Sequence, residues 1–182
     1  SSPTGGLKDT IPPVLLRAYP KLNNTLFDKD EIELVFDEYL QMKDLKRQLI
    51  ISPPIEKSYY KIKPPESVVS KKIEIELLDS LDENTTYTFN FGKSIVDYNE
   101  GNVLPFFYYA FSTGPELDSL EIRGKIDDAL EKETESFISV YLYPADSTFN
   151  DSTIFLKKPF YVTSTLDSII YNFKNIREGE YE

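Results

Sequence analysis

Apolar and polar residues alternate with a period of two along several short segments of the chain. The apolar positions are Ile32, Leu34 and Phe36 in one segment, Ile73, Ile75 and Leu77 in a second, and Tyr87, Phe89 and Phe91 in a third. Because successive side chains of a strand point to opposite faces, this period predicts half-buried β-strands. We therefore expect an all-β, antiparallel fold in which each strand turns one face to a core.

Further segments complete a first domain. Val14 to Tyr19 and Phe106 to Thr113 are rich in β-branched and aromatic residues and are predicted as its first and last strands. Lys43 to Leu49 is the only stretch in this half that can form a helical turn, and we expect a short crossover there. Gly114-Pro115 marks the end of the unit. Residues 14–116 are therefore predicted to form an Ig-like β-sandwich.

One local motif supports a sandwich. The run from Leu81 to Tyr87 has the spacing of a tyrosine corner, in which a tyrosine hydroxyl bonds to the backbone a few residues upstream. We expect Tyr87 to make this bond where the chain crosses between sheets.

Residues 117–182 are predicted to form a second, smaller β-domain. The segments 120–126, 138–142, 160–163 and 169–173 read as its strands, and a fifth strand begins near Tyr181. Four strands make a marginal core, because a small domain buries a small fraction of its surface. We expect this second β-sandwich to be incomplete and the natural protein to continue past Glu182.

The first thirteen residues have no periodic apolar face. They are rich in Gly, Pro, Ser and Thr, and they begin at Ser1 without Met. We expect residues 1–13 to be a tether that follows a removed targeting segment.

Charge and composition exclude several classes of function. The chain has 20 Lys+Arg against 31 Asp+Glu, a net charge of −11, and such a surface repels the phosphate backbone of nucleic acids. It has no His and no Cys, so it cannot supply a Ser-His-Asp unit, a Cys-His unit or a cysteine-based zinc site. We expect no catalytic residues, no cofactor and no nucleic-acid partner.

Several motifs carry a family resemblance. They are Pro3 to Pro13, Ile32 to Glu38, Glu83 to Gly92, Ile95 to Asn102 and Phe111 to Gly114. Together they resemble Bacteroidetes outer-membrane lipoproteins that open with a bacterial Ig-like domain. The resemblance implies a lipid-modified Cys before Ser1 and a position at the outer membrane, more often surface-exposed than periplasmic.

The second half carries a separate resemblance. Ile122 to Ile126, Val140 to Tyr143 and Phe173 to Tyr181 are similar to the start of a carboxypeptidase-regulatory-like β-domain. Such families are non-enzymatic. The resemblance implies a protein-binding or scaffold module, an accessory subunit of an outer-membrane β-barrel protein complex. The alternative is a carbohydrate-binding or adhesion module at the cell surface.

The segment from Asp97 to Asn102 is a candidate metal site. Asp97, Asn99 and Asn102 place three oxygen-bearing side chains around Gly101, a pattern that hard cations such as calcium use. Asn and Gly are also the residues of a plain β-turn, so we expect a turn without a metal and keep the metal site as the alternative.

Two aromatic runs are candidate partner sites. They consist of Tyr59 and Tyr60, and of Phe106, Phe107, Tyr108 and Tyr109. In a strand alternate side chains enter the core, so each run divides between core and an exposed surface for a protein or a sugar.

Six Asp-Ser/Thr pairs resemble the O-glycosylation signal of exported proteins in the same bacterial group. The acceptors would be Thr10, Ser80, Ser119, Ser147, Ser152 and Ser168. The same dipeptide is also ordinary turn chemistry.

Overall fold

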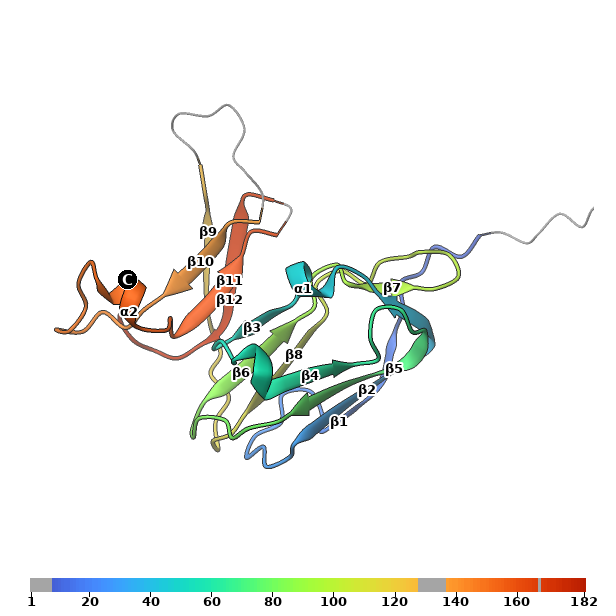
Figure 1. Ribbon diagram of the computed structural model, residues 1–182, viewed down its shortest axis with the longest axis horizontal. Coiled ribbons are helices and arrows are strands. Elements are labelled where there is room, and N and C mark those ends of the chain that lie inside the picture. The colour runs from blue at the N-terminus through green and yellow to red at the C-terminus, as the bar shows by residue number, and fades with distance from the viewer. Residues whose placement is uncertain (1–7, 128–136, 167) are drawn as a thin grey trace, which may run out of the picture.

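The computed structural model describes residues 8–127, 137–166 and 168–182 of the chain. Figure 1 shows a larger β-sandwich with a smaller group of strands beside it. All strand pairs in both parts are antiparallel. The expected all-β, antiparallel fold is therefore confirmed.

The first sheet of the sandwich, sheet A, has five strands. Its order is β1 (Leu15–Tyr19), β2 (Glu31–Met42), β5 (Ser70–Leu77) and β4 (Tyr60–Lys63), and β7 (Ile95–Asp97) pairs with the far end of β2. The predicted strand at Ile32 to Phe36 is thus the first half of a longer strand that holds three neighbours.

The second sheet, sheet B, has three strands in the order β3, β6, β8. They span Ile50–Ser52, Thr86–Asn90 and Tyr108–Ser112. The short helix α1 (Leu45–Gln48) leads from β2 to β3 where the sequence predicts a crossover, and a 3₁₀ turn, η1 (Lys57–Tyr59), precedes β4.

The core lies between the two sheets and has an aromatic centre. Ile32, Leu34 and Phe36 of sheet A are at most 1% exposed, as their alternation predicts. From sheet B, the fully buried ring of Phe111 lies 4.1 Å from that of Phe27 and 5.7 Å from that of Tyr87. Burial of large apolar side chains is the main stabilising term of such a fold.

The tyrosine corner forms. The Tyr87 hydroxyl accepts the backbone N–H of Asp82 at 3.0 Å and faces the carboxylate of the same residue at 3.3 Å. Burial raises the pKa of Tyr87 to about 12, so the hydroxyl keeps its proton at neutral pH. The corner holds the segment that enters β6.

The outer faces of the two sheets differ in charge. Register places Arg17, Lys61, Lys63 and Lys72 on the outer face of sheet A with Glu31, Glu33, Glu74 and Glu76. Glu33 bonds both Arg17, at 2.8 Å, and Lys72, at 3.3 Å. Sheet B instead turns out Ser52, Thr88, Asn90 and Tyr108, with no charged side chain among its strand residues on that face.

The second domain consists of two antiparallel strand pairs. β9 (Leu120–Lys125) pairs with β12 (Ile170–Ile176), and β10 (Ser139–Leu142) pairs with β11 (Tyr161–Ser164). The short helix α2 (Thr153–Leu156) lies between β10 and β11. A small cluster of Tyr161, Phe173 and Ile176 forms its core.

The second domain packs against sheet B. The backbone N–H of Val162 in β11 donates to Ser52 Oγ of β3 at 3.0 Å. Near the connection, the Arg177 guanidinium bonds the Asn84 carbonyl and faces Asp118 at 3.4 Å. Alternation places Thr86 and Thr88 on the outer face of sheet B, where exposed side chains are expected. They are only 2% and 6% exposed, because the second domain covers this face.

No helix in the described part of the chain is long and apolar enough to cross a membrane.

Candidate functional site

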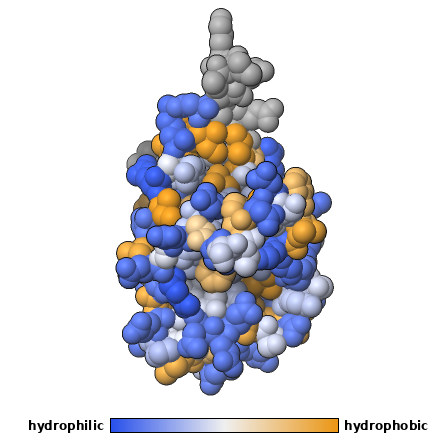
Figure 2. Space-filling view, turned by 90° about the vertical axis from the view of Figure 1, so that its left-hand side faces the viewer, coloured by the Kyte–Doolittle hydropathy of each residue, from blue (hydrophilic) through white to orange (hydrophobic). Residues whose placement is uncertain are grey.

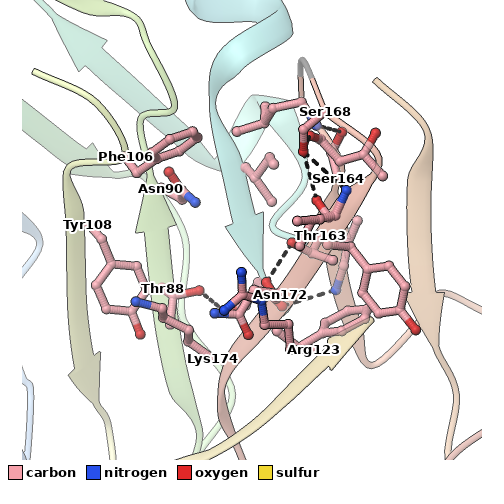
Figure 3. A pocket seen from close by; sticks show the side chains of 18 residues that line it. Thr88, Asn90, Phe106, Tyr108, Arg123, Thr163, Ser164, Ser168, Asn172 and Lys174 are labelled. Atoms are coloured by element: carbon pink, nitrogen blue, oxygen red, sulfur yellow. Dashed lines mark hydrogen bonds between the residues drawn. The ribbon is translucent and has the colours of Figure 1, made fainter. Parts of the chain in front are cut away.

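A pocket of about 510 Å³ lies between sheet B and the second domain. One side comes from the outer face of sheet B, where Thr88 and Asn90 of β6 lie beside Tyr108 of β8. The other side comes from β9 and β12, where Arg123 lies directly opposite Asn172. Figure 3 shows these two sets of side chains facing each other, with the β11 side chains Thr163 and Ser164 above Asn172 in this view.

The pocket lining is positively charged although the chain is acidic. Its described residues include Arg123 and Lys174 but no Asp or Glu. Neither cation forms an ion pair with a carboxylate of the described chain. Lys174 Nζ lies 5.3 Å from the ring centre of Tyr108, a cation–π distance.

Most hydroxyl groups of the lining are already used within the protein. Thr88 Oγ1 donates to the Ser52 carbonyl at 3.2 Å, and Thr163 Oγ1 donates to the Asn172 carbonyl at 2.9 Å. Ser168 Oγ donates to the Thr165 carbonyl at 3.1 Å. These side chains shape the wall and hold it in place.

Two buried polar atoms of the lining have no partner in the described structure. They are the hydroxyl of Tyr108 and Oδ1 of Asn172. Burial raises the pKa of Tyr108 well above its ordinary value, and the negative charge of Glu121 adds to this, so the phenol is a neutral donor and acceptor at physiological pH. A buried polar group without a partner is unfavourable, and such groups often lie at functional positions.

The structure separates the aromatic residues that the sequence grouped as partner sites. Tyr59 is 43% exposed and Phe106 is 49% exposed, whereas Tyr109 is fully buried. Tyr60 and Phe107 pack against the sandwich core. Phe106 and Tyr108 line the pocket, and Tyr59 lies on a separate surface at η1.

The three predicted metal ligands are not brought together. Asp97 is 1% exposed and its carboxylate accepts the N–H groups of Asn99, at 2.8 Å, and Glu100, at 2.9 Å. The Asn102 amide points elsewhere and donates to the carbonyls of Asp9 and Ile11 at 3.2 and 3.1 Å. Asp97 thus stabilises the backbone of its own turn, whereas Asn102 bonds the segment that precedes β1.

A different carboxylate group forms around Asp97. Oxygen atoms of Glu38, Asp97 and Glu100 lie within 4.8 Å of one another. Burial and the neighbouring negative charge of Asp97 raise the pKa of Glu38 to about 7. The pKa of Asp97 lies below its ordinary value. Burial acts to raise it, but the hydrogen bonds from the N–H groups of Asn99 and Glu100 act in the other direction and outweigh burial. At neutral pH Glu38 therefore holds a proton part of the time and shares it with Asp97.

Sequence reasoning missed Glu38 because its neighbour is distant in the chain. Glu38 comes near Asp97 through the pairing of β2 with β7, which alternation alone does not reveal. The adjacent Asp37 is exposed, and its Oδ1 accepts the N–H of Val14 at 2.8 Å. The pair Asp37-Glu38 thus points to opposite sides, as expected for neighbours on a strand.

All six candidate glycosylation acceptors are exposed in the structure: Thr10, Ser80, Ser119, Ser147, Ser152 and Ser168. Ser168 also lines the pocket, and the Asp167 that precedes it lies outside the described residues. Exposure is compatible with both the glycosylation and the turn interpretations.

Comparison with solved structures gives two similar chains. The N-terminal part of the bacterial S-layer protein SbsC is 12% identical with a TM-score of 0.37, and the match covers 94% of this chain and 37% of that one. An L,D-transpeptidase from Mycobacterium smegmatis is 11% identical with a TM-score of 0.33, covering 85% of this chain and 74% of that one. A comparison with curated proteins found no match.

Comparison with family models gives a more specific result. Residues 9–113, more than half of the chain, match the model described as the bacterial Ig-like domain. The matched range contains the whole two-sheet sandwich with its tyrosine corner. The chain therefore belongs to the bacterial Ig-like domain family.

Proposed function

We propose that this chain is a non-catalytic, protein-binding module of a cell-envelope protein. The observation that carries the proposal is an exposed apolar turn on the second domain. Ile154, Phe155 and Leu156 of α2 are 51%, 82% and 81% exposed. Contiguous exposed apolar side chains of this kind mark interaction sites on soluble domains.

The turn is held so that these side chains point outward. Thr153 is 6% exposed, and its Oγ1 accepts the backbone N–H of Asn150 at 2.9 Å. Lys157 Nζ donates to Thr148 Oγ1 at 2.9 Å. The polar residues on both sides thus fix the backbone, and the three apolar side chains stay available to a partner. Figure 2 views the side of the molecule on which α2 lies and shows hydrophobic patches among hydrophilic residues.

The residue that follows Lys157 after the apolar turn contacts the segment that leads to one of the predicted partner residues, Tyr59. Lys158, just after α2, forms an ion pair with Glu56, the residue before η1. This contact brings the α2 segment next to the segment that carries exposed Tyr59. We propose that the docking surface is centred on Ile154, Phe155 and Leu156 and that Tyr59 of the first domain contributes to it.

The lipoprotein resemblance gives the proposal its finer form. We propose that the module is held at the outer membrane by a lipid anchor before Ser1, is surface-exposed, and serves as an accessory subunit of an outer-membrane β-barrel protein. The resemblance of residues 117–182 to a carboxypeptidase-regulatory-like domain supports a structural role. The lack of His and Cys in the chain supports a role without catalysis.

The proposal is tested by capture of the partner from native membranes in mild detergent. The full-length natural protein should retain a stoichiometric envelope protein, and the double variant Phe155→Ser/Leu156→Ser should lose it. Leu16→Ser is the matched control, because Leu16 is 66% exposed but lies on β1. If the double variant retains the partner as well as the control does, α2 is not the docking turn. Incorporation of labelled fatty acid tests the anchor.

One observation favours carbohydrate binding as a second candidate function. Of the predicted aromatic residues, Phe106 and Tyr108 lie in the pocket between the domains. An aromatic ring beside polar groups in a concave site is the usual arrangement for holding a small polar ligand in a fixed orientation.

A further inference from the structure

We propose that the pocket between the two domains binds a hydroxylated carboxylate, namely an acidic sugar such as a uronic acid. This inference rests on the second candidate function and names the ligand class of that site. The residues that would contact the ligand are Tyr108 from the sandwich and Arg123, Asn172 and Lys174 from the second domain.

The first argument is charge. The chain carries 31 acidic and 20 basic residues, yet the described lining holds two cations and no carboxylate, and Glu121, whose charge acts on Tyr108, lies outside the lining. A site with this local charge attracts an anion even on an acidic protein. Arg is the side chain best suited to a carboxylate, because its planar guanidinium donates two parallel hydrogen bonds.

The second argument is placement. Arg123 is the cross-strand partner of Asn172, and Lys174 follows two positions along β12, so all three side chains leave the same face of the β9–β12 pair. That face looks across the pocket at Tyr108, whose ring lies 5.3 Å from Lys174 Nζ. Lys174 is thus next to the ring of the unpartnered phenol, and Arg123 lines the same pocket.

The third argument is hydrogen bonding. Within the described structure, the hydroxyl groups of Thr88, Thr163 and Ser168 are committed to backbone carbonyls. The Tyr108 hydroxyl and Asn172 Oδ1 are not. The amide oxygen is an acceptor only, so it needs a donor from the ligand, and the phenol can both donate and accept. A sugar hydroxyl satisfies either group, and a simple inorganic anion at neutral pH offers few donors.

The fourth argument is size. The cavity of about 510 Å³ falls in the range of about 300–1,000 Å³ that is usual for small-molecule sites. Phe106 lies at its edge with 49% of its surface exposed and offers an apolar face to the C–H side of a sugar ring. The pocket suits a short saccharide.

Titration calorimetry of the whole chain tests the inference, with digalacturonate as probe, the neutral galactose disaccharide as its matched partner, and inorganic phosphate as a simple anion. We expect digalacturonate to bind and the other two to bind at least tenfold more weakly. The double variant Arg123→Gln/Lys174→Gln should weaken digalacturonate binding at least tenfold. The control Lys46→Gln/Lys61→Gln removes the same charge from exposed positions outside the pocket and should not.

Tyr108→Phe separates binding from folding. It removes a buried hydroxyl without a partner in the described structure, so the variant should be at least as stable as the natural chain while its affinity for digalacturonate falls. Equal binding of the acidic and neutral disaccharides would overturn the inference but leave carbohydrate binding intact. Absence of binding to both would overturn carbohydrate binding as well, and equal binding of phosphate would reduce the pocket to a general anion site.

Discussion

The hydroxyl of Tyr87 accepts the backbone N–H of Asp82 at 3.0 Å, which ties β6 to the segment that precedes it. Tyr87→Phe keeps the buried ring and removes this bond together with the 3.3 Å bond that the hydroxyl donates to the Asp82 carboxylate. We expect the free energy of unfolding to fall by about 1–2 kcal/mol, since one hydrogen bond has a net value of about 1 kcal/mol. Urea unfolding measures it.

Tyr60→Phe is the control for the tyrosine corner. Tyr60 packs with its ring against Phe89, and its hydroxyl bonds no residue of the described structure. A loss of stability equal to that of Tyr87→Phe would show that the corner bond contributes nothing of its own.

Phe111 lies at the centre of the aromatic core, between Phe27, Tyr87 and Tyr109. Phe111→Ala should lower the free energy of unfolding by about 3–5 kcal/mol, because it removes a fully buried ring and leaves a cavity. Phe155→Ala makes the same chemical change at a side chain that is 82% exposed and should shift stability by less than about 0.5 kcal/mol. Thermal or urea denaturation of both variants checks the contrast, and similar values for the two would contradict the assigned core.

Glu38 makes stability depend on pH. Its pKa is raised to about 7 in the folded protein from 4.5, so between these values the folded state holds a proton that the unfolded state has lost. Stability should therefore fall as pH rises from 4.5 to about 7, and stay level above that. The depressed pKa of Asp97 acts in a separate window, because its contribution is present above the unfolded value of 3.8 and is lost as pH falls below it.

Glu38→Gln tests this pH dependence. The variant should flatten the stability profile between pH 4.5 and 7 and should be more stable than the natural chain at pH 8. Glu31→Gln, an exposed change on the same strand, is the control and should leave the profile unchanged. Urea unfolding midpoints of both variants at four pH values measure the dependence. If the two variants give parallel profiles, Glu38 is not the source of the pH dependence.

Arg177 links the second domain to the first through its bond to the Asn84 carbonyl, and Asp118 of its own domain holds the guanidinium there. Arg177→Ala should speed hydrogen exchange at the Val162 amide, which bonds Ser52 across the interface, while lowering global stability by no more than about 1 kcal/mol. Arg177→Lys retains the charge but not the fork of donors, so it should give an intermediate exchange rate. Unchanged exchange in both variants would show that Arg177 does not hold the interface.

The sequence was informative about features that depend on a single strand or its immediate neighbours in the chain. The alternation at Ile32, Leu34 and Phe36 placed all three in the core, and the spacing before Tyr87 located the corner. A period of two shows which face of a strand is apolar, and in a sandwich the apolar face packs into the core between the two sheets.

The sequence was uninformative where a feature depends on pairing between distant segments. Thr86 and Thr88 alternate as outward residues but are covered by the second domain. Glu38 reaches Asp97 only through the pairing of β2 with β7. The pocket likewise forms from β6 and β8 on one side and from β9 and β12 on the other, and no short-range pattern encodes that these faces meet.

The balance of charges on the outer face of sheet A affects how the molecule orients near a charged surface. Four cations of this face, Arg17, Lys61, Lys63 and Lys72, lie among the five carboxylates of Glu31, Glu33, Asp37, Glu74 and Glu76, so its charges nearly cancel. Most of the net charge of −11 is therefore carried by the rest of the chain. Near an anionic surface we expect the molecule to turn this nearly neutral face inward and its acidic remainder outward, an electrostatic preference that weakens as salt rises.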